Sequence, residues 1–250
     1  MNPLRHDFIR RCRSSTPIPS ANSSPSAPPL SPDERLRYLD IGCGGGIFAE
    51  SAARLPTTLS VTAIDPSPGV LAIARSHAKK DPLLSLPAPE QQQQQQQQPG
   101  APRRLTYRNC TIESLPLPPA DADRFDVVSV FEVIEHVDYP SAFLDRAAQF
   151  VKPDGGWLVL STIARTWTSW FTTNLVAEDI LGVVPKGTHD WNKYINVEEM
   201  RAYFRERQDE FGWGEPRVMG VVYVPGVGWR EVQGSERVGN YFLGVQRVRR

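Results

Sequence analysis

Short apolar runs alternate with amphipathic stretches through the middle of the chain. The apolar runs are short and rich in β-branched residues, which is typical of strands. The predicted strands cover residues 38–41, 59–64, 105–108, 125–131 and 157–161. Helices are predicted between them over residues 47–55, 69–79 and 140–151. Strands that alternate with helices in this way indicate βαβ units and a parallel sheet.

The last fifth of the chain has a different pattern. A helix is predicted over residues 197–211, and two strands follow it over residues 217–222 and 241–245. Because no helical stretch separates these late strands, they are expected to form an antiparallel edge. The whole pattern predicts an α/β fold, a doubly wound, mostly parallel seven-stranded sheet with an antiparallel edge strand.

Two low-complexity stretches interrupt this pattern. Residues 14–34 are rich in Ser, Pro, Ala and Asn, and residues 81–104 contain eight consecutive glutamines bracketed by prolines. Such stretches bury too little apolar surface to offset the entropy lost on ordering. We therefore expect an N-terminal helix over residues 1–13, a linker over 14–34 and one domain over 35–250, with a low-complexity insertion at 81–104.

Composition excludes several classes of protein. Lys and Arg together number 28, as do Asp and Glu, so the formal net charge is +0. A protein that mainly coats nucleic acid usually has a basic excess. No apolar run approaches the length of a membrane-spanning helix, which excludes an integral membrane protein built from such helices. The three cysteines form no C-x-x-C pair, which excludes a zinc ribbon and fits a reducing compartment.

A glycine-rich turn follows the first predicted strand directly. It reads Asp40-Ile41-Gly42-Cys43-Gly44-Gly45-Gly46, and it opens a helix. Glycines at such a turn let the backbone approach a ligand closely. Asp65 ends the second predicted strand, where an acid suits hydrogen bonds to ribose hydroxyls. The turn and the acid together predict a site for a nucleoside-containing cofactor.

An acidic cluster follows the fourth predicted strand. If this segment is helical, Glu132, Glu135 and His136 lie at i, i+3 and i+4 on one face. Two carboxylates and one imidazole suit Mg²⁺ or Mn²⁺ when water completes the coordination shell. Alternatively, His136 acts without metal as a general base that deprotonates an acceptor hydroxyl. The residues alone leave both interpretations open.

These motifs resemble those of class I S-adenosylmethionine-dependent methyltransferases with a Rossmann-like fold. The glycine turn matches their first motif, Asp65 the second, and residues 125–128 the fourth strand. Two further strings, N-P-L-R at residues 2–5 and V-P-K-G-T-H-D at residues 184–190, make the chain similar to the ubiquinone-biosynthesis O-methyltransferase family. That resemblance covers residues 2–13 and 36 to about 245. It implies methylation of ring hydroxyls on polyprenylated benzenoids.

The resemblance also assigns roles to individual residues. It implies S-adenosylmethionine and Mg²⁺ as cofactors, with Glu132 and His136 as catalytic residues. The implied cofactor contacts are Arg5, Gly42, Gly44, Asp65 and Phe131. The implied metal ligands are Glu132, Glu135 and His136.

A Trp-rich segment within residues 163–196 fits a lipid substrate. Its apolar side chains spread over a broad arc of a predicted helix that is too short to span a bilayer. We expect it to lie in the membrane surface; the alternative is a lid that packs over the active site. The candidate entrance residues are Lys186, His189, Lys193 and Tyr194.

The resemblance also implies a place in the cell and partners. We expect a peripheral protein on the matrix side of the mitochondrial inner membrane, with a polyprenylated phenol or catechol as substrate. A multi-enzyme complex of ubiquinone biosynthesis is an expected partner, and nucleic acid is not. The family has a further segment before N-P-L-R, so we expect the chain to be truncated at its N-terminus.

Two alternatives to this expected function remain open. One is a small-RNA terminal 2′-O-methyltransferase, and the other is a non-catalytic member of a biosynthetic complex.

Overall fold

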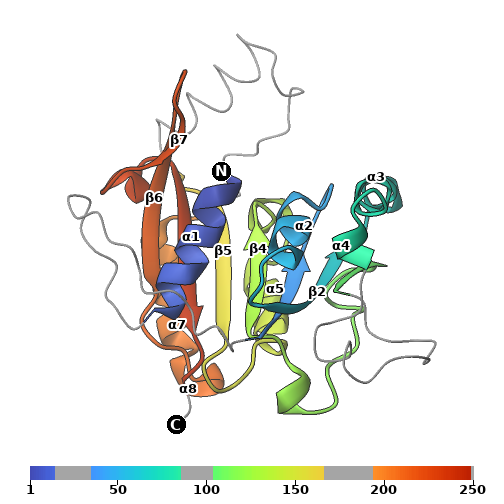
Figure 1. The fold of residues 1–250 in the computed structure, drawn as a ribbon. Coiled ribbons are helices and arrows are strands. Elements are labelled where there is room, and N and C mark those ends of the chain that lie inside the picture. Colours follow the sequence, from blue (N-terminus) through green and yellow to red (C-terminus); the bar gives the residue numbers. More distant parts are fainter. Residues whose placement is uncertain (15–34, 86–103, 166–193, 249–250) are drawn as a thin grey trace.

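The computed structural model describes residues 1–14, 35–85, 104–165 and 194–248 (Figure 1). Within them, one sheet of eight strands has the order β3-β2-β1-β4-β5-β8-β6-β7. The first five strands in that order are parallel to one another, whereas β8 is antiparallel to both β5 and β6. The strands are β1 (Leu36–Ile41), β2 (Thr58–Asp65), β3 (Leu105–Asn109), β4 (Val127–Phe131), β5 (Trp157–Ile163), β6 (Arg217–Val224), β7 (Gly228–Glu231) and β8 (Asn240–Gln246).

Helices cover both faces of this sheet (Figure 1). The described α-helices are α1 (Asn2–Arg13), α2 (Ile47–Ala53), α3 (Pro68–Ala78), α4 (Pro82–Ser85), α5 (Pro140–Ala148), α7 (Val197–Glu206) and α8 (Gln208–Phe211). Three 3₁₀ turns also occur, η2 (Asp121–Asp123), η3 (Ile134–His136) and η6 (Ser235–Arg237). Helices α1 and α2 lie on one face, and α5 and α7 lie on the other.

Two hydrophobic cores result, one on each side of the sheet. Successive residues of a strand point to opposite faces. In β1, Tyr38 packs in the core under α1 and α2, whereas Leu39 packs in the core under α5 and α7. The parallel strands are therefore apolar on both faces, as expected for a doubly wound sheet. The predicted α/β fold class is confirmed.

The sheet has one strand more than the predicted seven. The additional strand is β7, which pairs with β6 from Val221↔Glu231 to Val224↔Gly228. Its sequence, Gly-Trp-Arg-Glu, is short and follows a Pro-Gly turn, so it has no strand periodicity of its own. Only its pairing with β6 makes it a strand.

The boundaries of several predicted segments also differ. The predicted helix over residues 197–211 is divided into α7 and α8, which meet at Arg207. At the two ends of the predicted insertion 81–104, helix α4 follows Asp81, and the buried Arg104 donates to the Leu55 carbonyl over 2.7 Å. The linker 15–34, the glutamine tract and the Trp-rich residues 166–193 lie outside the described residues.

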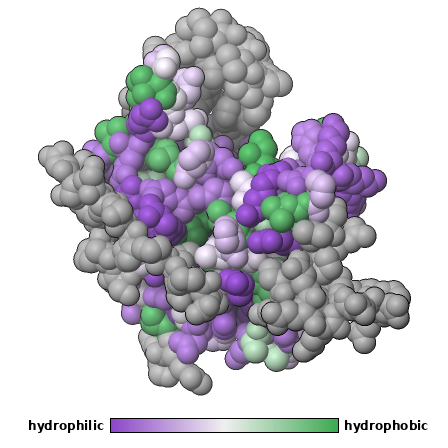
Figure 2. Space-filling view, viewed as in Figure 1, coloured by the Kyte–Doolittle hydropathy of each residue, from purple (hydrophilic) through white to green (hydrophobic). Residues whose placement is uncertain are grey.

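On the face shown in Figure 2, the described residues are mainly hydrophilic, and their hydrophobic side chains form separate patches. No helix among the described residues is long and apolar enough to cross a membrane.

Candidate active site

The glycine turn lies at the carboxyl end of β1, where open α/β sheets bind their ligands. Gly42, Gly44 and Gly46 all have positive φ angles, of 67°, 52° and 82°. At Gly42 a Cβ would come within 2.5 Å of a Val133 methyl, and at Gly46 it would overlap the Tyr107 hydroxyl. At Gly44, nothing lies within 4 Å of such an atom. The turn therefore packs tightly on both sides and leaves open space at its centre.

Asp65 holds this turn to the end of β2. One of its carboxylate oxygens accepts the backbone N–H of Gly44 at 2.9 Å, and the other accepts that of Ser67 at 2.8 Å. The side-chain amide of Asn109 donates to the Asp65 carbonyl at 3.0 Å. Asp65 thus lies beside the glycine turn, where the sequence places it. Its contact with ribose stays a prediction.

Asp40 is an ionisable group in the centre of the fold that the predicted set of site residues omits. It is only 2% exposed and accepts a hydrogen bond of 2.7 Å from the Ser129 hydroxyl. Burial raises the pKa of Asp40 to about 7, although the Ser129 hydrogen bond and the charge of Arg5 oppose the rise. The sequence signal was an acid within the otherwise apolar run Tyr38–Ile41.

We expect Asp40→Asn to change the pH dependence of stability. A carboxyl group whose pKa is raised by folding stabilises the native state below its unfolded pKa, and that contribution is lost as pH rises towards 7. Between pH 5 and pH 8 the variant should therefore gain about 2–3 kcal/mol relative to wild type. Urea unfolding of both proteins at the two pH values measures this difference in unfolding free energy. All other titratable groups are present in both proteins, so their effects cancel in the comparison. Parallel stability curves would contradict the expectation.

Helix α1 brings Arg5 to the same edge of the sheet. The Arg5 guanidinium lies 4.7 Å from the centroid of the Phe131 ring and 3.5 Å from a carboxylate oxygen of Glu132. Its side chain is 16% exposed, and its Nε is buried with no hydrogen-bond partner. The structure therefore brings Arg5 together with Phe131 and Glu132, although Arg5 and Glu132 are 127 residues apart in the chain.

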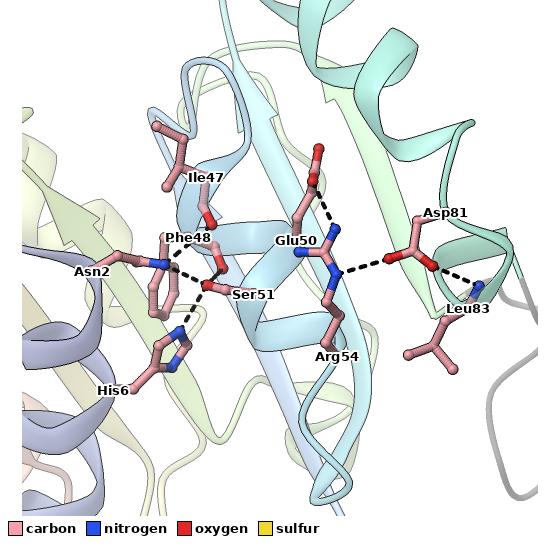
Figure 3. Close-up of polar contacts among 9 residues, drawn as sticks. All are labelled: Asn2, His6, Ile47, Phe48, Glu50, Ser51, Arg54, Asp81 and Leu83. Carbon is pink, nitrogen blue, oxygen red and sulfur yellow. Dashed lines mark hydrogen bonds and ion pairs between the residues drawn. The ribbon is translucent and has the colours of Figure 1, made fainter.

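Side-chain contacts hold α1 in this position. The amide of Asn2 donates to the Ser51 hydroxyl over 2.8 Å, and the His6 ring nitrogen lies 2.7 Å from the same oxygen (Figure 3). The His6 ring also stacks on Phe48 at 5.0 Å. Burial, and then the charge of Arg5, lower the pKa of His6 to about 4. His6 is therefore neutral at physiological pH and packs as an aromatic side chain.

Helix α2, which contacts α1 through Ser51 and Phe48, is also linked to the start of α4. Arg54 donates to Glu50 over 3.1 Å and to Asp81 over 2.8 Å, and Asp81 accepts the N–H of Leu83 (Figure 3). Helix α2, which begins at the glycine turn, is thus fixed from both sides.

The acidic cluster does not form the helical face that its spacing suggested. Glu132 has a positive φ of 59° and lies outside the 3₁₀ turn η3, which contains only Ile134–His136. Glu135 points into the protein, is 7% exposed, and accepts a 3.2 Å hydrogen bond from the Thr162 hydroxyl. Burial raises the pKa of Glu135 to about 7. His136 is exposed.

The predicted metal ligands are therefore not gathered around one point. In the described part of the chain, no three His, Cys, Asp or Glu side chains form a group that could hold a metal ion. Glu132 faces Arg5 and Glu135 faces Thr162, so their carboxylates are directed to different partners. The residue types suit Mg²⁺, but this arrangement does not fit it.

A cavity of about 400 Å³ lies beside the 3₁₀ turn η3, between α5 and α7. Its apolar walls include Ile134, Leu144 and Met200, and the ion pair of Arg165 with Glu199 lies at its border. Of the four predicted entrance residues, Tyr194 lines this cavity and is 1% exposed. The other three lie outside the described residues.

Comparison with known proteins shows which sequences this chain resembles. A family model described as a methyltransferase domain matches residues 18–208. The chain is 42% identical to the mitochondrial ubiquinone biosynthesis O-methyltransferase of Candida albicans, over 87% of this chain and 60% of that protein. It is 33% identical to the ubiquinone biosynthesis O-methyltransferase of Nitrobacter winogradskyi, over 99% of this chain and 80% of that protein.

A solved structure supports the fold. The plantazolicin methyltransferase BpumL in complex with SAH superposes with a TM-score of 0.53, at 12% identity, over 86% of this chain and 76% of that one. At this identity, the likeness concerns the fold alone. The chain spans 60% of the length of the Candida relative.

Proposed function

The chain belongs to the family of ubiquinone biosynthesis O-methyltransferases, and we propose that it transfers a methyl group from S-adenosylmethionine to a ring hydroxyl of a polyprenylated phenol or catechol. The names of the relatives favour this function over the small-RNA methyltransferase and over a non-catalytic role. Neutral net charge also disfavours a nucleic-acid substrate.

One observation carries the proposal: three separate segments meet at the carboxyl edge of β1 and β4. These are the glycine turn with its open space at Gly44, the Arg5 guanidinium beside Phe131 and Glu132, and the turn of residues 132–136. The cationic Arg5 suits the carboxylate of the methionine part of the cofactor. We assign hydrogen bonding to the ribose hydroxyls to Asp65, which ends β2, and an apolar wall of the cofactor site to Phe131.

Methyl transfer from a sulfonium needs an aligned acceptor oxygen that has lost its proton. We assign proton removal to His136, because imidazole accepts a proton near neutral pH and this side chain is exposed in η3, the turn that follows β4. Glu132, which faces the Arg5 guanidinium, would orient the acceptor hydroxyl. The hydrogen bond from Thr162 to Glu135 holds η3 against β5 and so fixes the position of the next residue, His136.

The Mg²⁺ site at Glu132, Glu135 and His136 stays a prediction from the sequence resemblance. Because the described side chains do not gather as ligands, the proposed steps use only the protein's own groups. The apolar cavity between α5 and α7 is our candidate for the aromatic ring or the first part of the polyprenyl tail.

We also propose a mitochondrial location, from the printed names of the eukaryotic relatives. Peripheral attachment to the matrix side of the inner membrane, and membership of a ubiquinone-biosynthesis complex, belong to the same proposal. A polyprenylated substrate dissolves in the bilayer, so its enzyme must work at a lipid surface.

The decisive experiment measures methyl transfer from labelled S-adenosylmethionine to a short-tailed polyprenyl catechol, in Mg²⁺ and in EDTA. Transfer in either condition supports the function, and no transfer despite bound cofactor refutes it. Activity that EDTA abolishes and Mg²⁺ restores would support the metal prediction. Equal rates would leave His136 as a base without metal.

Arg5→Met should weaken S-adenosylmethionine binding by about 10- to 30-fold, because the charge-assisted hydrogen bond to the cofactor carboxylate is lost. Isothermal titration with S-adenosylmethionine measures this directly. Arg10→Met is the matched control, since Arg10 lies on the same helix and pairs with Asp7 instead. Equal affinities of the two variants would contradict the role of Arg5.

A further inference from the structure

The β6–β7 hairpin projects beyond the edge of the sheet that carries the active site. Strand β6 runs in the same direction as β5, because β8 lies antiparallel between them. Asn240 of β8 pairs both with Ile163, the last residue of β5, and with Val221 of β6. Residues 222–228 therefore extend past the end of β5. Figure 1 shows the hairpin rising past the N-terminus of α1.

The end of this hairpin is apolar and exposed. From Val221 to Trp229 the sequence V-V-Y-V-P-G-V-G-W contains no charged residue. Residues 223–227 are exposed without interruption, with Tyr223 at 56% and Val227 at 53%. Figure 2 shows hydrophobic and near-neutral side chains at the end of the projecting hairpin, at the upper left. A contiguous patch of this kind marks an interaction surface, unlike single exposed apolar residues.

Polarity changes in order along the hairpin. Aliphatic Val224 and Val227 stand at the tip. Next comes the cross-strand pair of Tyr223 and Trp229, whose rings lie 5.6 Å apart. The following position carries Arg230, which is exposed.

This order matches one leaflet of a lipid bilayer. Acyl chains take aliphatic side chains, the interface takes Tyr and Trp, and the phosphates of the headgroups take Arg. From Val222, which pairs with Arg230, to Val224 the strand rises by two residues, or about 7 Å. This rise lies within the depth of about 5–10 Å to which interfacial elements enter a leaflet. A groove on a partner protein would not require this sequence of layers.

We propose that the β6–β7 hairpin inserts its tip into a lipid bilayer and holds the active-site edge against the membrane. The inference rests on the proposed function only in its purpose, namely access to a bilayer-dissolved substrate. It assigns a membrane contact distinct from the Trp-rich segment 163–196. The tip enters the leaflet, and the sheet stays in water.

The test is binding of the full chain to phosphatidylcholine vesicles, with and without phosphatidylglycerol, measured by co-sedimentation and by Trp fluorescence. The double variant V224D/V227D should lose at least 10-fold in vesicle affinity, because charged side chains would enter the leaflet. The matched control I73D/L117D changes two other exposed apolar residues, 55% and 46% exposed, and should bind as wild type does.

Equal vesicle affinity of V224D/V227D and wild type would overturn the proposal. So would wild-type protein that ignores both vesicle types, or that instead dimerises through the tip in a sedimentation experiment. Vesicle binding needs no methyl acceptor, so its outcome is independent of the proposed reaction. Suppose that neither the wild type nor V224D/V227D methylates a short-tailed acceptor, and that only V224D/V227D loses vesicle binding. The proposed function then fails, and the membrane contact stands.

Discussion

His136→Ala is expected to lower kcat for methyl transfer by about 100- to 1000-fold, which lies within the range of about 10²- to 10⁴-fold for a general base. The affinity for S-adenosylmethionine should stay within about threefold of wild type, because the proposed cofactor contacts do not include His136. Single-turnover methyl transfer and cofactor titration on the same preparation separate the two effects. His136 is exposed in η3, so the substitution removes few packing contacts of the fold.

His77→Ala is the control for this experiment. His77 is also exposed, on α3, and takes no part in the proposed chemistry. A His136→Ala enzyme that keeps more than a third of its kcat would remove His136 from the mechanism. A His136→Gln variant distinguishes proton transfer from hydrogen bonding, since glutamine can hold the acceptor oxygen but cannot take its proton at neutral pH.

Gly44→Ala is expected to raise the Kd for S-adenosylmethionine by about 30-fold, or about 2 kcal/mol. The added methyl group would enter the open space at the centre of the turn, where the proposed cofactor lies. The protein itself should lose only about 1 kcal/mol of stability, from the strain of a side chain at a φ of 52°. Calorimetric titration and thermal unfolding measure the two quantities.

Two other glycines serve as controls. Gly226 has a φ of 78° and open space around it but lies in the β6–β7 turn, so Gly226→Ala should show the strain without the loss of affinity. Gly46→Ala should instead destabilise the fold by about 2–3 kcal/mol, because its Cβ would overlap the Tyr107 hydroxyl. If Gly44→Ala binds the cofactor as Gly226→Ala does, the proposed cofactor position is wrong.

The positions of the strands and the glycine turn follow from the sequence because their causes are local. An apolar run such as residues 157–161 favours a buried strand wherever it occurs, and β5 extends it only to Ile163. Positive φ angles at Gly42, Gly44 and Gly46 are accessible to glycine at little cost. The motifs around them also led to the family, which the comparisons confirm.

The arrangement of the acidic cluster could not be obtained in this way. Its i, i+3, i+4 spacing assumed a helix, but the chain leaves β4 through a positive φ at Glu132 and tightens into a 3₁₀ turn. A tertiary partner, Thr162 on β5, then holds the Glu135 carboxylate inside the protein. Local periodicity contains no information about that partner.

The position of Arg5 and the state of Asp40 depend even more on tertiary contacts. Residues 14–34 separate Arg5 from the sheet in sequence, yet Ser51 and Phe48 on α2 hold α1 so that Arg5 lies beside Glu132. Asp40 has its raised pKa because the sheet and two helical layers exclude water from it. The sequence by itself determined which residues form the strands, the turn and the family motifs, since these depend on neighbours in the chain. Only the tertiary structure decided which of those residues meet and how they are charged, because contact and burial are set by segments far apart in the sequence.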